Sequence, residues 1–294
     1  MGKPIFIAGA TATGKSAVAL EVAKKTGGQI VSVDSMQVYQ KMDIGTAKPT
    51  AEQRAQIPHH LIDCTTIREG FDVARFVREA ENKQKNIKQP ILCGGTGLYF
   101  QAWLEGLGEA PAGDPKVRKE LEETPPQSLL KELEEKDPAT YKSIDQDNPR
   151  RIVRAVEVIR ITGKPFSEQK AKWTNLAPRN FFLLDRTSQD LRRRIEARVE
   201  TMFERGLVEE TCSLRSELES SPVAQQALGY RQVISHLKGE QDLPETVSLV
   251  KSRTWKFARR QKTWFKKFNQ ATVVQALENE GPEEIAQQII KLIE

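Results

Sequence analysis

The chain has 294 residues, of which 38% are hydrophobic and 29% charged, and its formal net charge is +5. This composition is typical of a globular protein, and the length suits one large or two modest domains. No apolar run approaches membrane-spanning length and no secretory signal precedes the first strand, so we expect a cytoplasmic protein without a membrane partner. The widely separated Cys64, Cys93 and Cys212 argue against a disulfide framework and against structural zinc. The mildly basic balance permits a nucleic-acid partner.

The first motif is the phosphate loop, residues 9–16, which fits the pattern Gly-x4-Gly-Lys-Ser/Thr. An apolar run at 4–8 predicts a strand before it, and helical periodicity from 17 to 23 predicts a helix after it. In this context the backbone N–H groups and the helix N-terminus bind phosphate, Lys15 reaches the terminal phosphates, and Ser16 can hold Mg²⁺. A nucleotide and any other diphosphate ester present the same oxygens, so the loop leaves its ligand open.

Strands are predicted at 29–33, 60–63 and 90–93, and a helix at 72–88. Short apolar strands separated by helices indicate a parallel α/β sheet that binds ligands at the carboxyl ends of its strands. Asp34 and the turn 94–97 lie at two such ends, so both should converge on the phosphate loop.

Each of these two segments has a structural alternative. Asp34 either caps a turn or accepts a proton from a substrate. The glycines of the turn 94–97 let a ligand approach closely, beside the hydroxyl of Thr96, but the same residues would make a plain tight turn.

The character of the chain changes at about residue 113. Charged helical sequence follows, with apolar stripes at Leu121, Leu129, Leu130 and Leu133 and at Ile152, Val153, Val156 and Ile159. We therefore expect a helical insertion at 114–175 between two parts of a core, 1–113 and 176–294. The core resumes with a strand at 180–185, helices at 189–205 and 245–268, a strand at 272–275 and a terminal helix.

Basic side chains gather in several places in the second half of the chain. Arg150 and Arg154 share a helical face beside Arg151, and Arg194 lies one turn before Arg198. The segment 251–267 contains no acidic residue. Such runs are either solvated faces or phosphate contacts. Phe257, Trp264 and Phe268 fall on one face of the predicted helix 245–268 and are expected to pack on the core.

Taken together, the motifs resemble those of bacterial tRNA dimethylallyltransferases, also called tRNA isopentenyltransferases, over essentially the whole chain. The matching segments are GATATGKS, VSVDSMQVYQKMDIGTAKP, PHHLID, GGTGLYFQAWLEGL, DNPRRIVRAVEV, GKP, RIEARVETMFERGLVEE, ALGYRQV and RRQKTWF. DSMQVY and GTAKP, in order behind a phosphate loop, are the most specific of them. The expected fold class is α/β: a P-loop NTPase-like core, with a parallel sheet flanked by helices, plus the helical insertion.

The resemblance implies transfer of a dimethylallyl group from its diphosphate to N6 of the adenosine beside the tRNA anticodon, at position 37 of the tRNA. Asp34 would be the general base or hydrogen-bond acceptor for the N6 amine, with Thr96 and Lys15 also catalytic and Mg²⁺ held at Ser16. The residues expected to hold the diphosphate are Gly9, Ala10, Thr11, Ala12, Thr13, Gly14, Lys15, Ser16, Arg194 and Arg198. The residues expected to contact the tRNA anticodon stem-loop are Asp34, Ser35, Met36, Gln37, Thr96, Arg118, Arg150, Arg151, Ile152, Val153 and Arg154. We expect a monomer.

Three other activities could use the same loop. A small-molecule P-loop kinase would use Asp34 to activate a substrate hydroxyl, and a free-adenylate isopentenyltransferase would share the chemistry; neither needs a large basic surface. An RNA-binding NTPase switch would need a hydrolytic aspartate after an apolar strand, for which Asp63 is the only candidate.

Overall fold

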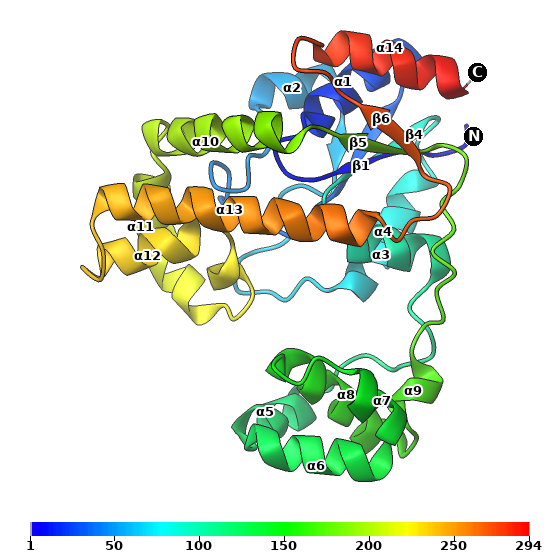
Figure 1. Cartoon of the computed structure of the whole chain (residues 1–294), viewed down its shortest axis with the longest axis vertical. Helices are drawn as coiled ribbons and strands as arrows, with labels where there is room; N and C mark the ends of the chain where they lie inside the picture. The colour runs from blue at the N-terminus through cyan, green and yellow to red at the C-terminus, as the bar shows by residue number, and fades with distance from the viewer. Residues whose placement is uncertain (1, 294) are drawn as a thin grey trace. The chain divides into compact units, whose positions relative to one another are not determined.

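A computed structural model describes residues 2–293 and divides the chain into two compact units (Figure 1). The larger unit comprises residues 1–100 and 175–294, and the smaller one residues 101–174. Within the smaller unit the segments 105–110 and 169–174 bond to each other: Trp173 Nε1 donates to the Gly106 carbonyl at 2.9 Å, and the Glu109 N–H donates to the Gln169 carbonyl at 3.0 Å.

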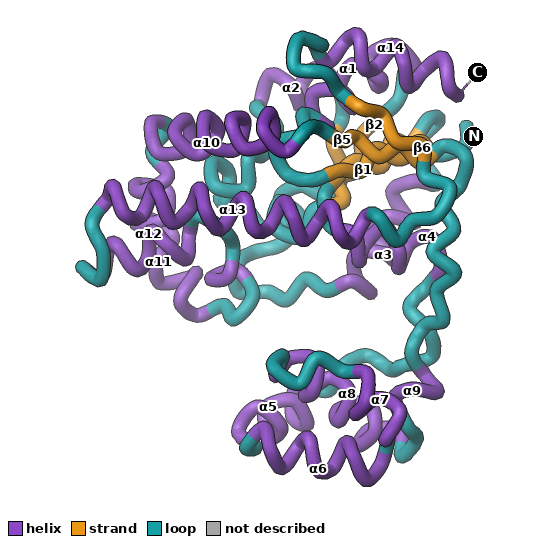
Figure 2. The backbone as a smooth tube through the Cα atoms, in the orientation of Figure 1, coloured by secondary structure: helices purple, strands orange, loops and turns teal. Residues whose placement is uncertain are grey.

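The larger unit is built on one six-stranded sheet in which every neighbouring pair is parallel. Its order is β3-β2-β4-β1-β5-β6, and Figure 2 shows the strands at the centre of this unit with helices around them. The strands are β1 (Ile5–Gly9), β2 (Gln29–Val33), β3 (His59–His60), β4 (Pro90–Gly94), β5 (Phe181–Asp185) and β6 (Thr272–Gln275). The topology confirms the predicted parallel α/β core.

One predicted strand is wrong in its extent. The segment 60–63 was expected to be extended, but β3 ends at His60. Leu61 and Asp63 take left-handed backbone conformations, with φ of 59° and 55°. These conformations are incompatible with a strand, so the chain turns there instead.

The helices of the larger unit are α1 (Lys15–Thr26), α2 (Ala51–Gln56), α3 (Val73–Gln84), α4 (Gly97–Glu105), α10 (Ser188–Glu204), α11 (Leu207–Ser220), α12 (Tyr230–Leu237), α13 (Leu243–Phe265) and α14 (Pro282–Ile293), with α4 running into the smaller unit. A short 3₁₀ helix, Ala224–Gln226, precedes α12. The sequence analysis did not predict α11 and α12. A signal for α11 was present, because its buried residues Leu207, Thr211, Leu214 and Leu218 repeat at helical spacing. No helix among residues 2–293 is long and apolar enough to cross a membrane.

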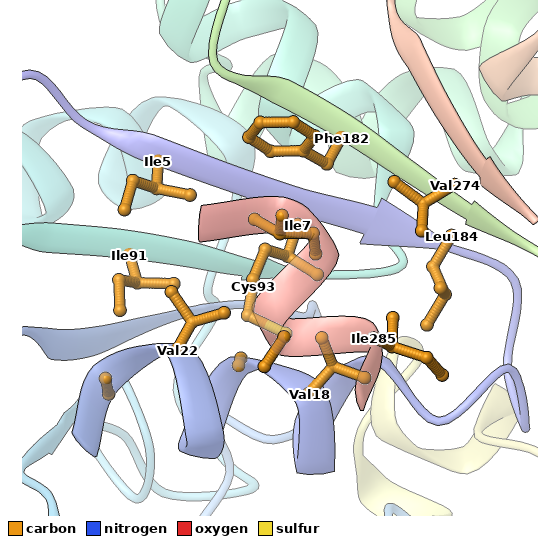
Figure 3. Close-up of a cluster of buried hydrophobic side chains, with 14 of the residues drawn as sticks. Ile5, Ile7, Val18, Val22, Ile91, Cys93, Phe182, Leu184, Val274 and Ile285 are labelled. Carbon is orange, nitrogen blue, oxygen red and sulfur yellow. The ribbon is translucent and has the colours of Figure 1, made fainter. Parts of the chain in front are cut away.

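One face of the sheet packs against α1 and α14. Alternate residues of each strand point to this face, as Ile5 and Ile7 do on β1, and they meet Val18 and Val22 of α1 and Ile285 of α14 (Figure 3). The helices α1 and α14 also pack on each other, so the terminal helix closes the core formed around the first one. This packing holds the phosphate loop between β1 and α1 at the carboxyl edge of the sheet.

The opposite face carries an aromatic cluster. Phe6 of β1 stacks on Phe181 of β5 with ring centroids 5.7 Å apart, and Phe181 stacks on Phe268 at 4.9 Å. Phe100 and Phe265 join the cluster edge-on. Phe265 therefore anchors the end of α13 to the sheet, and α13 in turn packs along α10.

The smaller unit consists of helices with a core of its own. They are α5 (Pro115–Glu123), α6 (Pro126–Lys136), α7 (Pro138–Ser143), α8 (Pro149–Thr162) and α9 (Phe166–Gln169). Both predicted apolar stripes meet in this core, where Leu121, Leu129 and Leu133 pack against α8, while Leu130 is only partly buried. The expected helical insertion is therefore confirmed as an element of the fold.

Candidate active site

The phosphate loop is held in an unusual backbone conformation. Ala12 and Gly14 have positive φ values of 64° and 95°. The carbonyl of Ala10 accepts hydrogen bonds from the Thr13 hydroxyl at 2.9 Å and from Lys15 Nζ at 3.1 Å. A side chain on Gly9 would meet the Leu184 carbonyl of the neighbouring strand at 2.7 Å, so only glycine fits there.

Two arginines engage the next carbonyls of the loop. Arg194 Nε donates to the Ala12 carbonyl at 2.9 Å, and Arg186 Nε donates to the Thr13 carbonyl at 2.8 Å. By contrast, the N–H groups of Ala12, Gly14, Lys15 and Ser16 donate to no other residue of the described range 2–293. The loop thus has its carbonyls bonded to protein and leaves amide donors for an anion.

Asp34 and Thr96 organise the two turns beside the phosphate loop. The Asp34 Oδ1 atom accepts hydrogen bonds from the N–H groups of Met36 at 2.8 Å and Gln37 at 3.3 Å, so Asp34 does cap its turn. The Thr96 hydroxyl oxygen accepts from the Ser35 N–H at 3.1 Å, which ties the turn after β4 to the turn after β2. The Oδ2 atom of Asp34 makes no hydrogen bond with residues 2–293 and is available to a substrate.

These segments surround one cavity of about 310 Å³ in the larger unit. The sequence-predicted residues that line it are Thr11, Lys15, Ser16, Asp34, Ser35, Met36, Gln37, Thr96 and Arg198. The other predicted residues of the loop, Gly9, Ala10, Ala12, Thr13 and Gly14, are absent from this lining. Arg194 does not line the cavity; its guanidinium lies behind the loop, beside Gly14.

The charged groups of the cavity are largely withdrawn from solvent. Burial lowers the pKa of Lys15, although Cys93 and Asp34 oppose the shift. Burial likewise lowers the pKa of Arg198, and the Asp34 carboxylate opposes it. Burial raises the pKa of Cys93 to about 12, so its thiol is protonated at neutral pH and is a poor nucleophile. The cavity therefore combines the Asp34 carboxylate with three cations, Lys15, Arg198 and the exposed Arg260, and the surroundings of the first two strengthen electrostatic interactions.

Part of the cavity wall is apolar. Val199 and Met202 of α10, Val250 and Phe257 of α13, and Leu228 line it. This wall can accommodate a hydrocarbon group or the face of a base next to the charged groups.

Gln261 is a site residue that the sequence analysis missed. The residue is 7% exposed; its Oε1 accepts from the Thr11 N–H at 2.8 Å, and its Nε2 donates to the Gly95 carbonyl at 2.9 Å. It therefore joins the phosphate loop to the turn that carries Thr96. Its position in the basic segment 251–267 gave no signal of this bridging contact.

Glu210 and Tyr230, which the analysis also left without a role, hold the GTAKP segment. The Glu210 carboxylate accepts hydrogen bonds from the N–H groups of Ile44 at 2.9 Å and Gly45 at 3.4 Å and from the Tyr230 hydroxyl at 2.5 Å. Burial and the neighbouring Glu210 raise the pKa of the Tyr230 phenol, so it remains a donor. A side chain on Gly45 would clash with the Tyr230 ring.

Asp63 is occupied by contacts away from the cavity. Its two oxygens accept from Lys48 Nζ at 2.5 Å and from Arg54 Nη1 at 2.6 Å. Burial acts to raise the pKa of Asp63, but these two cations outweigh it and hold the pKa below its ordinary value. The carboxylate is thus a structural ion-pair partner and is absent from the cavity lining.

The smaller unit places the predicted arginines of α8 differently from one another. Arg150 and Arg151 are exposed, and Arg151 Nη1 lies 3.8 Å from Asp145 Oδ2. Arg154 of α8 and the exposed Arg118 of α5 both donate to Glu157 Oε2 at 2.7 Å. The side chains of Ile152 and Val153 are 1% and 9% exposed and belong to the core of the unit. Their side chains therefore support the helix from inside.

The basic segment 251–267 is only partly free to meet a polyanion. Lys251 pairs with Glu200 at 2.6 Å, and Lys262 pairs with Asp185 at 2.8 Å. The predicted core face was wrong for Phe257, which lines the cavity; Phe268 is buried, and the half-buried Trp264 packs its ring against Gly97. The residues of α13 that are buried at this end are Ala258, Gln261 and Phe265, because α13 meets the sheet along that stripe.

The magnesium ion expected at Ser16 has one suitable protein oxygen in the cavity. The exposed Ser16 hydroxyl lines it, and Mg²⁺ favours one or two protein oxygens completed by phosphate oxygens and water. Within residues 2–293 no group of three or more His, Cys, Asp or Glu could hold a metal ion alone.

Comparisons with known proteins show the family to which the chain belongs. The family model described as IPP transferase matches residues 37–268. The tRNA dimethylallyltransferase 1 of Trichlorobacter lovleyi is 44% identical over 275 residues, which cover 89% of this chain and 90% of that protein.

Solved structures give the same result over the whole chain. The crystal structure of full-length tRNA isopentenylpyrophosphate transferase from Bacillus halodurans has a TM-score of 0.69 and 34% identity, covering 100% of this chain and 97% of that one. A eukaryotic dimethylallyltransferase acting on tRNA has a TM-score of 0.79 and 27% identity, covering 98% and 77%. The chain therefore belongs to the IPP transferase family, whose members named here are tRNA dimethylallyltransferases.

Proposed function

We propose that this protein transfers a dimethylallyl group from dimethylallyl diphosphate to N6 of the adenosine beside the anticodon of tRNA. The observation that carries the proposal is the cavity in which Asp34, Lys15, Arg198 and the phosphate loop meet next to an apolar wall. A prenyl diphosphate has the matching chemistry, because it joins a charged diphosphate end to a small hydrocarbon.

The diphosphate is the leaving group, so negative charge grows on the ester oxygen that joins it to the allylic carbon as that C–O bond breaks. Donors that are already oriented toward the place where this charge develops lower the barrier. The amides of Gly14 and Lys15, the Lys15 ammonium and the Arg198 guanidinium are such donors. A bound Mg²⁺ at Ser16 would neutralise further phosphate charge.

The nucleophile is an adenine amine, whose lone pair is delocalised into the ring. Asp34 would accept its proton as the C–N bond forms, a contribution typically worth about 10²–10⁴-fold. The geometry suits this use, since Oδ1 is occupied by the turn that it caps while Oδ2 faces no protein donor in the described range 2–293. Thr96 would hold the Asp34 turn in place through its bond to the Ser35 N–H.

The target base has to leave the anticodon-loop stack to reach Asp34, which costs on the order of a few kcal/mol. We infer that Ser35, Met36 and Gln37 contact the base, and that the insertion 114–175 grips the anticodon stem-loop through Arg118, Arg150, Arg151 and Arg154. Phosphate contacts of this kind offset the cost of extruding the base. The protein would act as a monomer.

The competing activities lack comparable support. A kinase or a free-adenylate transferase has no use for a tRNA-sized partner, and the family members named above act on tRNA. Asp63, the candidate hydrolytic aspartate of an NTPase switch, is paired with Lys48 and Arg54.

Incubation with labelled dimethylallyl diphosphate, Mg²⁺ and either tRNA or AMP tests the proposal. We expect label in tRNA only, at an adenosine beside the anticodon. Calorimetry should give tighter binding of dimethylallyl diphosphate than of ATP. Label in AMP at the same rate, or ATP hydrolysis in step with turnover, would reject the proposed reaction.

A further inference from the structure

Arg186 is a buried cation with no place in the reaction described above. It follows β5 directly, and its residue is 3% exposed. Its Nε donates to the Thr13 carbonyl of the phosphate loop at 2.8 Å. A buried charge is costly unless it is fully paired, so its partners decide whether it can serve the loop.

The guanidinium is fixed from three directions. Its Nη1 donates to Asp190 Oδ2 at 2.8 Å and to the Leu277 carbonyl at 3.0 Å, in addition to the Nε contact with the loop. The Asp190 side chain is 3% exposed, and it also accepts from Arg193 at 2.9 Å. Asp190 thus neutralises and aims Arg186 without touching the loop itself.

The burial of this pair does not by itself indicate a stabilising role. Replacing a buried ion pair with apolar residues of similar size is often neutral or stabilising, so a buried pair is weak evidence for a stabilising role. What distinguishes this pair is its target. It is directed at the peptide group that joins Thr13 to Gly14, in the centre of the predicted anion site.

A peptide group is planar and trans, so its carbonyl and its N–H point in opposite directions. A bond that holds the Thr13 carbonyl toward Arg186 therefore turns the Gly14 N–H the other way, into the cradle of the loop. Gly14 has a φ of 95° and can flip readily without such a restraint. Arg186 also brings positive charge close to the loop, since its Nη2 lies 3.8 Å from the Cβ position of Gly14.

We propose that Arg186, held by Asp190, is a positioning residue that orients the Thr13–Gly14 peptide group of the phosphate loop for binding diphosphate. This inference rests on the proposed function, because it takes diphosphate as the anion in the loop. It assigns to Arg186 a task separate from that of Arg198, which lines the cavity and faces the substrate directly.

Calorimetric titration with inorganic diphosphate and Mg²⁺ tests the inference on the full-length protein. Arg186→Met should weaken diphosphate binding about tenfold to a hundredfold, the range for losing a charged hydrogen bond that aligns a donor. The affinity of this variant for tRNA alone should change less than about twofold, because distant sites that share no partner are nearly independent. Arg186→Lys keeps the charge but is too short to reach both Asp190 and Thr13. Its affinity for diphosphate should therefore lie between those of the wild type and Arg186→Met.

Arg193→Ala is the matched control. Arg193 contacts the same Asp190 carboxylate but its side chain is 60% exposed and has no contact with the loop. It should leave diphosphate affinity unchanged. An equal loss in this variant would show that any disturbance of Asp190 is enough, and would overturn the assignment to Arg186.

Arg186→Met with Asp190→Leu separates positioning from folding, because it removes both buried charges. Arg186→Met alone leaves the Asp190 charge buried with one partner fewer, so it should lower the Tm. We expect the double variant to have a Tm nearer that of the wild type, while its affinity for diphosphate stays low. Recovery of affinity with the Tm, or wild-type affinity in Arg186→Met, would reject the inference. If the wild-type protein binds neither diphosphate nor dimethylallyl diphosphate, the proposed function fails instead, and the inference with it.

Discussion

Arg154 forms an ion pair of 2.7 Å with Glu157, a carboxylate with no solvent exposure. Arg118 reaches the same oxygen from α5 at 2.7 Å. These two arginines are therefore committed in part to the fold of the smaller unit. Arg150 and Arg151 lie on the exposed side of α8, where a phosphate backbone can reach them.

Replacing Arg150 and Arg151 together by Ala should weaken tRNA binding without a change in Tm. Each lost phosphate contact should reduce the slope of log affinity against log salt by roughly 0.7–0.9. Filter binding at several salt concentrations measures both quantities, with the exposed Lys164→Ala as the control. An unchanged slope would mean that this part of α8 is only a solvated surface.

Arg154→Ala should behave differently, because it leaves Glu157 with one cation instead of two. Loss of a charged hydrogen bond to a buried group costs about 1–3 kcal/mol, so thermal unfolding should occur at a lower temperature. Arg154→Ala with Glu157→Gln should recover part of that loss, since the buried charge is then gone. A normal Tm in the single variant would show that the ion pair is dispensable.

Asp34→Asn should abolish transfer and spare tRNA binding. The amide oxygen of Asn can still accept the Met36 and Gln37 N–H groups, so the turn survives while the proton acceptor is lost. Single-turnover rates with labelled dimethylallyl diphosphate are the measurement. More than about a tenth of the wild-type rate would remove Asp34 from the role of base, given the usual size of general-base effects.

Glu210→Ala should loosen the segment 43–46, whose N–H groups and whose neighbour Tyr230 donate to this carboxylate. Gly45 and Thr46 line the cavity, and Gln37 Nε2 donates to the Thr46 carbonyl at 3.2 Å. Loosening this segment should therefore displace Gln37, one of the residues expected to contact tRNA. We expect kcat/KM for tRNA to fall about tenfold or more.

Affinity for diphosphate should not change in Glu210→Ala, because the phosphate loop does not contact Glu210. The exposed neighbour Glu209→Ala is the control. A parallel loss of diphosphate and tRNA affinity would point to general unfolding of α11 instead.

Much of the fold could be predicted from the sequence because its signals are local. The strands at 29–33 and 272–275 were placed correctly, and the phosphate loop with its flanking strand and helix was recognised from contiguous residues. Parallel order then requires the ends of β1, β2 and β4 to share one edge, so the position of Asp34 and Thr96 beside the loop follows from the sequence alone.

Only the tertiary structure decided which residues distant in the chain contact one another. Gln261 reaches Thr11, Arg186 reaches Thr13, and Glu210 reaches Ile44. No periodicity or spacing encodes such contacts, because each depends on how a helix is rotated and placed against the sheet. The rotation of α13 likewise decides where its aromatic residues lie: Phe265 packs against the sheet, and Phe257 lines the cavity.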